Sequence, residues 1–459
     1  MGANDVANAF GTTVGSKSLT IVKAYILASI FEALGSILIG YNVIDTIRKS
    51  IVTVSIYEDS VGLLLLGQIA TLGGCALWLF VATVLKLPIS ATHSIIGASL
   101  GFTLVCKGFS GVQWNQIMII ASSWFISPVL AGFIAVVLYL LIDHLVLRKV
   151  DPVRCGLRNL PIFFFLVITC NCVMITREGS RVLNLRKLDV TESILLSTSI
   201  GLISSFLIFL FYIPKLKKFI SDVDLNHVKS ECSVSVSNAL TLGDKTAEED
   251  KKAKESEEQA SLSKPSNHYF KRFKKFFDWL LPDAERIDTT RTLRLFTAIQ
   301  IFTACFAAFA HGANDVSNAI APLSAIFSIY RDFDVAQKGQ TPLFVLIFGV
   351  FSICSGLWIL GHKVIDTIGK NMSEINAASG FCIDFGSAVT VLVSSKYGLP
   401  VSTTHCLVGS VVAVGSLRGI RKINWALFRN VAISWVITLP VSAAFSAIIM
   451  IILRYIMQI

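Results

Sequence analysis

The residues best suited to chemistry lie in a seven-residue stretch that occurs twice. One copy reads Gly-Ala-Asn-Asp-Val-Ala-Asn from Gly2, and the other reads Gly-Ala-Asn-Asp-Val-Ser-Asn from Gly312. Both copies place amides and a carboxylate in apolar sequence, where a carboxylate is costly and usually functional. At helical spacing Asn4 and Asn8 share one face with Asp5 beside them. Asparagines alone could join helices, but a duplicated Asn-Asp motif favours a functional site.

A second stretch, the Leu-Pro motif, is also duplicated. It reads Leu-Pro-Ile-Ser-Ala-Thr-His from Leu87 and Leu-Pro-Val-Ser-Thr-Thr-His from Leu399. The proline ends or starts a helix, and the hydroxyl residues after it stand in capping position. A helix N-terminus with added hydroxyl donors is an anion site, best suited to an oxyanion. Capping alone would explain one copy, and the duplication favours binding. The hydroxyl residues are Ser90, Thr92, Ser402, Thr403 and Thr404.

The two aspartates of the Asn-Asp motifs, Asp5 and Asp315, complicate an anion site because they are themselves negative. Neither motif contains Lys or Arg. One solution is Na⁺ held by Asp, Asn and opened backbone oxygens next to the oxyanion. The other is a hydrogen bond from a protonated oxyanion to an Asp carboxylate. Three more polar residues in apolar segments are candidates for coupling: Glu32, Gln68 and Asp384.

The elements that must position these residues are membrane helices. Of the 459 residues, 54% are hydrophobic and 15% are charged, whereas soluble domains carry about 25% charged residues. The mean hydropathy is +0.69. We therefore expect an all-α polytopic membrane protein with roughly 10–12 membrane segments, some of them re-entrant or broken. The segment 114–147 contains Pro128 near its middle, which predicts a kinked or broken helix.

The order of the motifs divides the chain into two similar halves. Residues 1–213 and residues 291–459 each contain the Asn-Asp motif, then the Leu-Pro motif, then a Trp-rich segment with a proline. Another shared sequence, Val-Ile-Asp-Thr-Ile, starts at Val43 and at Val364. Two homologous halves around a central loop are typical of secondary transporters with inverted repeats.

The central loop, residues 214–290, has a different composition. Residues 244–264 are rich in Lys, Glu, Ser and Ala with few large apolar residues, which predicts disorder. Residues 268–281 place Phe and Leu on one face and Lys on another, which predicts an interfacial helix on an anionic membrane surface. The Lys/Arg bias places the loop on the cytoplasmic side.

The two Asn-Asp motifs differ in what precedes them. An apolar stretch, residues 293–310, leads into the second copy, whereas only Met1 precedes the first. If the halves are equivalent, most of one membrane segment is missing from the first half. We therefore expect this sequence to be an N-terminally truncated form.

The motifs resemble those of the inorganic phosphate transporter (PiT) family, in its eukaryotic form with a large intracellular loop. The resemblance covers nearly the whole chain outside residues 214–290 and rests on GANDVANAFGTTVGS, LPISATH and FCIDFGSAVTVLVSSKYGLPVSTTHCLVGSVVAVG. It implies a sodium-coupled phosphate symporter with inverted repeats that works by alternating access. Sodium is then a co-substrate, and no other cofactor is implied. The sequence shows no nucleophile–base pair of the kind that would indicate an enzyme.

The resemblance also implies roles for individual residues. Glu32 matches a functionally important glutamate of the family, and sodium is expected near Asp5, Asp315 and Asp384. Relatives usually carry Glu where Asp384 stands and often where Gln68 stands, so the missing charge at Gln68 bears on cation stoichiometry or coupling. The positions implied to bind phosphate and sodium are Asn4, Asp5, Asn314, Asp315, Ser90, Thr92, Ser402, Thr403 and Thr404.

We thus expect symport of inorganic phosphate with Na⁺ across the plasma membrane. The expected partners are phosphate, Na⁺ and membrane lipid, with no nucleic acid, and homo-oligomer formation is left open. One alternative is a proton-coupled transporter or a transporter of another oxyanion, which replacing Na⁺ by choline in an uptake assay would separate. Another is a non-transporting phosphate sensor or receptor on the same scaffold, against which the intact site motifs speak.

Overall fold

A computed structural model describes residues 1–180, 182–220, 275–283, 285–333, 335–337, 339–369 and 371–458. It divides into two units, Met1–Ser205 with Ala284–Ile459, and Phe206–Asp283. The first half of the chain forms helices joined by short connections. They are α1 (Gly2–Gly15), α2 (Ile21–Ile39), α3 (Tyr41–Ser50), α4 (Val61–Val84), α5 (Ala91–Lys107), α6 (Trp114–Ile142), α7 (Pro152–Glu178) and α8 (Val190–Leu207).

The second half of the chain is also helical. Its helices are α11 (Thr290–His311), α12 (Ser317–Asp332), α13 (Leu343–Leu360), α14 (His362–Gly369), α15 (Ala377–Lys396), α16 (Thr403–Leu417) and α17 (Trp425–Met457). In the described part of the chain, 10 helical stretches are long and apolar enough to cross a membrane. The prediction of an all-α protein with about ten membrane segments is confirmed.

The loop predictions are covered only in part. The helix that starts with α8 continues through a π-helical turn, η4 (Ile208–Tyr212). Within the predicted interfacial helix, residues 275–280 are helical. Residues 268–274 of the predicted interfacial helix and the polar stretch 244–264 lie outside the described residues. The interfacial helix therefore stays a prediction.

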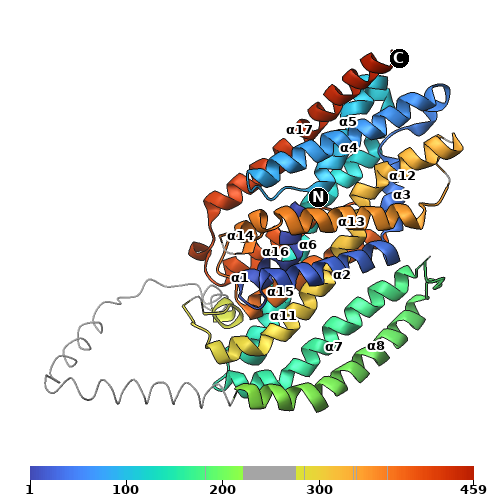
Figure 1. Cartoon of the computed structure of the whole chain (residues 1–459). Helices are drawn as coiled ribbons and strands as arrows, with labels where there is room; N and C mark the ends of the chain where they lie inside the picture. The colour runs from blue at the N-terminus through green and yellow to red at the C-terminus, as the bar shows by residue number, and fades with distance from the viewer. Residues whose placement is uncertain are drawn as a thin grey trace. The chain divides into compact units, whose positions relative to one another are not determined.

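The two peripheral helices of the first half form a hairpin of their own. Figure 1 shows α7 and α8 side by side, and Ser205 Oγ of α8 donates to the Pro161 carbonyl oxygen of α7 at 2.7 Å. A Cβ at Gly201 would meet Thr169 and Phe165 of α7, so the two helices are in close contact there. The Asn-Asp and Leu-Pro motifs lie elsewhere, in α1, in the helical run Thr290–Asp332, and at the starts of α5 and α16.

The Asn-Asp motifs keep a helical backbone, and the Leu-Pro motifs do not. The first Asn-Asp copy lies in α1, and the second forms a π-helical turn, η5 (Gly312–Val316), inside the continuous helical run Thr290–Asp332. π-Turns inside α-helices are frequent at functional sites. Residues 87–90 and 399–402 belong to no regular element. The opened backbone thus lies in the Leu-Pro motifs, directly before α5 and α16.

Of the kink or break predicted at Pro128, the break is wrong, because α6 is one continuous helix from Trp114 to Ile142. The kink stays a prediction. Proline lacks the N–H that would bond the carbonyl four residues earlier, here that of Trp124. His405 of α16 compensates, since its Nδ1 lies 3.2 Å from the Trp124 carbonyl oxygen. The helix α17 likewise runs on through Pro440.

Two glycines let α2 cross the helical run of the second Asn-Asp motif with the two backbones in direct contact. A Cβ at Gly35 would lie 1.9 Å from the Phe309 carbonyl oxygen, and a Cβ at Gly312 would lie 2.1 Å from the Glu32 carbonyl oxygen. Small residues permit such close crossings between membrane helices. The crossing brings Glu32 beside the second Asn-Asp motif.

Gly312→Ala should destabilise the protein by about 1–3 kcal/mol, because the added methyl group overpacks the crossing of α2 and η5. The measurement is the Tm of the purified protein in detergent. Gly62→Ala is the control, since a Cβ at Gly62 would meet no described atom within 4 Å. A Gly312 variant as stable as the Gly62 variant would show that the crossing is not tight.

Candidate functional site

The first asparagine of each Asn-Asp motif supports the opened backbone of the Leu-Pro motif in its own half. Asn4 Nδ2 donates to the Leu87 carbonyl oxygen at 2.8 Å, and Asn4 Oδ1 accepts from the Ile89 N–H at 3.0 Å. In the second half, Asn314 Nδ2 donates to the Val401 carbonyl oxygen at 2.8 Å. Backbone groups outside helices need such partners inside a membrane. These amides therefore make the non-helical segments possible.

The two Leu-Pro motifs also bond directly to each other. Thr92 Oγ donates to the Val401 carbonyl oxygen at 2.9 Å, and Thr404 Oγ donates to the Ile89 carbonyl oxygen at 3.1 Å. Thr92 and Thr404 hold equivalent positions, so the contacts are reciprocal. The N-terminal turns of α5 and α16 are thereby tied together at one place.

The second asparagine of each Asn-Asp motif reaches the Leu-Pro motif of the other half. Asn8 Nδ2 donates to Thr404 Oγ at 2.9 Å, and Asn318 Nδ2 donates to Thr92 Oγ at 3.0 Å. All four side chains are buried. Neither half can complete this arrangement alone, so the two halves build one site.

The serines of the Leu-Pro motifs cap the helices that follow. Ser90 Oγ accepts from the His93 N–H, and Ser402 Oγ accepts from the His405 N–H, each at 3.2 Å. This is ordinary N-capping. A hydroxyl that accepts in this way keeps its own proton as a donor, so both serines can also donate to a bound oxyanion.

The two motif aspartates have different surroundings. Asp315 Oδ2 accepts from Thr403 Oγ at 2.7 Å. The first half has Ala91 at the position of Thr403, and Asp5 Oδ2 is buried with no hydrogen-bond partner among the described residues. One carboxylate is therefore satisfied by the protein, and the other presents a free oxygen.

Glu32 adds a third buried carboxylate to this region. It is 3% exposed, and it interacts electrostatically with both Asp5 and Asp315. Like charges in a buried site are tolerated when a cation or a proton compensates them. In the two Asn-Asp motifs and at Glu32, the buried oxygens without a partner among the described residues are Asp5 Oδ2, Asn8 Oδ1, Glu32 Oε1, Asn314 Oδ1 and Asn318 Oδ1.

This set of oxygens suits a hard cation better than a transition metal. Within the described residues, no group of three or more His, Cys, Asp or Glu could hold a metal ion. Amide and carboxylate oxygens are ligands that hard cations accept. The arrangement can therefore combine a cation near the free Asp5 oxygen with an anion at the helix N-termini.

Asp384 and Gln68 lie apart from this cluster. Thr12 Oγ lies 2.7 and 2.8 Å from the two carboxylate oxygens of Asp384. Thr12 follows Asp5 by seven residues, about two turns and about 10 Å along α1, on the same face. Gln68 is buried on α4, and no hydrogen bond between described residues joins it to either Asn-Asp motif. Thr12 was not predicted from the sequence, although its spacing from Asp5 was a usable signal.

Comparison with known proteins adds an independent observation. The sequence pattern of the phosphate transporter family matches residues 1–446. The chain belongs to this family. It is a multi-pass integral membrane protein of a transporter family rather than an enzyme. The resemblance inferred from the motifs is thereby confirmed.

Individual relatives are similar over nearly their full length. The chain is 34% identical to sodium-dependent phosphate transporter 2 of Xenopus tropicalis, over 97% of this chain and 94% of that protein. It is 32% identical to sodium-dependent phosphate transporter 1 of Homo sapiens, over 97% and 92%. A solved structure described as the sodium-dependent phosphate transporter matches with a TM-score of 0.77 at 31% identity, over 99% of this chain and 95% of that one.

Thr12→Val should reduce phosphate uptake about tenfold or more, because the buried Asp384 carboxylate loses the hydroxyl that bonds it. Thr12→Ser keeps that hydroxyl and should retain uptake. Both variants are compared at equal amounts of correctly inserted protein. Equal uptake in the valine and serine variants would show that the Thr12–Asp384 contact has no part in transport.

Proposed function

We propose that the chain is a symporter that moves inorganic phosphate together with Na⁺ across the plasma membrane. Its full-length relatives are named sodium-dependent phosphate transporters. The observation that carries the proposal is the free carboxylate oxygen of Asp5, whose motif neighbours Asn4 and Asn8 bond to the two Leu-Pro motifs that are tied together. A site of this kind offers opposite ligand chemistry to a cation and to an oxyanion.

Phosphate, in this proposal, binds at the N-terminal turns of α5 and α16. The positive end of each helix and its free N–H groups favour an oxyanion. The hydroxyls of Ser90 and Ser402 add donors, while Thr92 and Thr404 fix the distance between the two turns. The absence of Lys and Arg from the Leu-Pro motifs fits a substrate that must be released again, because a fixed positive charge would hold it.

Sodium, in this proposal, compensates the carboxylates of the Asn-Asp motifs. Asp5 is the main ligand because its Oδ2 is free, and Asp315 contributes with Thr403. Glu32 lies near both aspartates and takes part in coupling. Asp384 with Thr12 provides a second cation position farther along α1, which keeps Asp384 among the sodium residues. Gln68 on α4 influences sodium only indirectly.

The two halves, residues 1–213 and 291–459, are proposed to act as inverted repeats that expose the site alternately to the two sides. Support comes from the equivalent contacts made by equivalent residues of the two copies, such as Thr92 and Thr404. Residues 214–290 form the cytoplasmic loop between the halves.

Uptake into proteoliposomes tests the proposal. Proteoliposomes with the purified full-length protein should take up labelled phosphate when an inward sodium gradient is imposed. This uptake should stop when choline replaces Na⁺. Uptake in choline that follows a pH gradient would instead indicate a proton-coupled transporter. Phosphate binding without uptake in any gradient would indicate a sensor.

Asp5→Asn and Asp315→Asn should each abolish sodium-driven uptake while leaving membrane insertion intact. Removing either carboxylate leaves too little negative charge for the cation that accompanies phosphate. Asp189→Asn, at an exposed position before α8, is the matched control and should transport like the wild type. Wild-type uptake in either motif variant would refute the assignment of the Asn-Asp motifs.

A further inference from the structure

The shared Val-Ile-Asp-Thr-Ile sequence has no place in the site described above. It forms part of α3 in the first half and of α14 in the second. The helix α3 packs against α12, and α14 packs against α1. Each copy thus covers the helix that carries, or directly follows, the Asn-Asp motif of the other half. The residue after the shared sequence differs, being Arg48 in α3 and Gly369 in α14.

At Gly369 the two helices touch through their backbones. A Cβ at Gly369 would lie 2.1 Å from the Gly11 carbonyl oxygen. A Cβ at Gly15 would lie 1.9 Å from the Gly369 carbonyl oxygen. No side chain fits between α1 and α14 at this point, so their contact is direct and without polar side chains.

At the equivalent position, Arg48 fills the contact with a buried charge. Its side chain is 1% exposed and pairs with Asp45 at 3.1 Å on its own helix. Arg48 Nη1 donates to Ser324 Oγ of α12 at 3.1 Å. The guanidinium therefore stands between α3 and α12 where the other half has bare backbone.

The same guanidinium holds the connection between α12 and α13. Arg48 Nη2 donates to the carbonyl oxygens of Gln337 and Gly339, at 2.9 and 3.0 Å. We call Gln337 together with residues 339–342 the strap. Thr341 of the strap is also hydrogen-bonded to Ser324, at 2.8 Å. Arg48 is thus the point where α3, α12 and the strap are joined.

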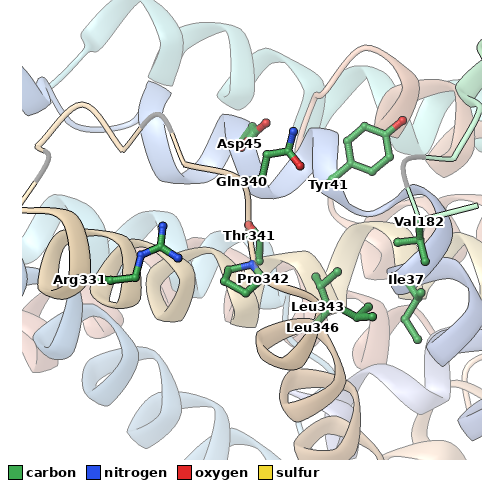
Figure 2. A pocket seen from close by; sticks show the side chains of 10 residues that line it. All are labelled: Ile37, Tyr41, Asp45, Val182, Arg331, Gln340, Thr341, Pro342, Leu343 and Leu346. Atoms are coloured by element: carbon green, nitrogen blue, oxygen red, sulfur yellow. The ribbon is translucent and has the colours of Figure 1, made fainter. Parts of the chain in front are cut away.

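A cavity of about 480 Å³ borders this junction. Side chains of α3 and of the strap line it together, as Figure 2 shows for Tyr41, Asp45 and Gln340. Thr341 and Pro342 complete the lining on the strap side. The strap therefore borders open space and is also bonded to the Arg48 guanidinium.

We propose that Arg48 is a polar latch that holds the strap against α3 and α12. It releases the strap when the protein opens at this junction during transport. The inference rests on the proposed alternating-access transport. Buried ion pairs add little net stability compared with apolar packing, but their hydrogen bonds can be exchanged for bonds to water once the strap moves into the cavity. The backbone contact at Gly369 has no side-chain hydrogen bonds that water could replace. The two equivalent contacts therefore open by different means.

Hydrogen exchange of the full-length protein in nanodiscs tests the latch directly. Arg48→Lys keeps the charge but loses the planar fork that reaches several acceptors at once. Amide exchange in the strap should rise about tenfold, while exchange in α5 and α16 and the Tm stay at wild-type values. Lys49→Ala is the matched control. Lys49 lies 3.7 Å from the same Asp45 carboxylate but is 36% exposed, and such pairs contribute little.

A second measurement separates a latch from a merely structural arginine. In the wild type, adding Na⁺ with phosphate should change the exchange of the strap, since ligands shift the balance between open and closed states. In the Arg48→Lys variant the strap should exchange fast with or without ligands, and sodium-driven uptake should fall at least several-fold.

Three results would overturn the latch. The first is a strap whose amides exchange at the wild-type rate in the Arg48→Lys variant, and the second is faster exchange spread over all helices in that variant. The third is a wild-type strap whose exchange does not change when Na⁺ and phosphate are added, although uptake is normal. A wild-type protein that takes up no phosphate would instead refute the proposed function, and the strap measurement in Arg48→Lys would still show whether Arg48 holds the strap.

Discussion

The structure depends on one constraint, which is that non-helical backbone inside a membrane must find hydrogen-bond partners. An unpaired backbone group in the hydrocarbon region costs several kcal/mol. The Leu-Pro motifs open the backbone at residues 87–90 and 399–402, and the amides of Asn4 and Asn314 bond to peptide groups of these segments. Asn4 and Asn314 are costly inside a membrane, but the non-helical backbone requires them as partners. The same non-helical segments expose two helix N-termini.

The sequence was sufficient for the parts of the fold that depend on local composition. Hydropathy located the membrane segments, and duplication pointed to the Asn-Asp and Leu-Pro motifs. It did not show that the helix stays unbroken at Pro128, because the side chain that bonds the freed Trp124 carbonyl belongs to His405 on a distant helix. The bonds between Thr92 and Val401 were equally out of reach, since spacing along a chain does not reveal which segments meet across two halves.

Some differences between the halves were readable in the sequence, but their meaning came from the structure. Ala91 stands where the second half has Thr403, and only the contact between Thr403 and Asp315 shows what the alanine omits. The first aspartate keeps a free oxygen as a result. The two copies of the Asn-Asp motif thereby hold carboxylates in different surroundings, one built into the hydrogen-bond network and the other with a free oxygen.

The reciprocal bonds also limit how the two halves can move. Thr404 bonds to Ile89 and accepts from Asn8, so the N-terminal turn of α16 is tied both to the other Leu-Pro motif and to α1. A rotation that separated the halves at this point would leave several buried donors and acceptors unpaired at once, each costing about 1–3 kcal/mol. Where α3 meets α12, the bonds of Arg48 can be exchanged for bonds to water, and where α14 meets α1 the contact is made by backbone at Gly369. In the proposed alternating access the centre therefore stays together, and the contacts at Arg48 and at Gly369 are the ones that open.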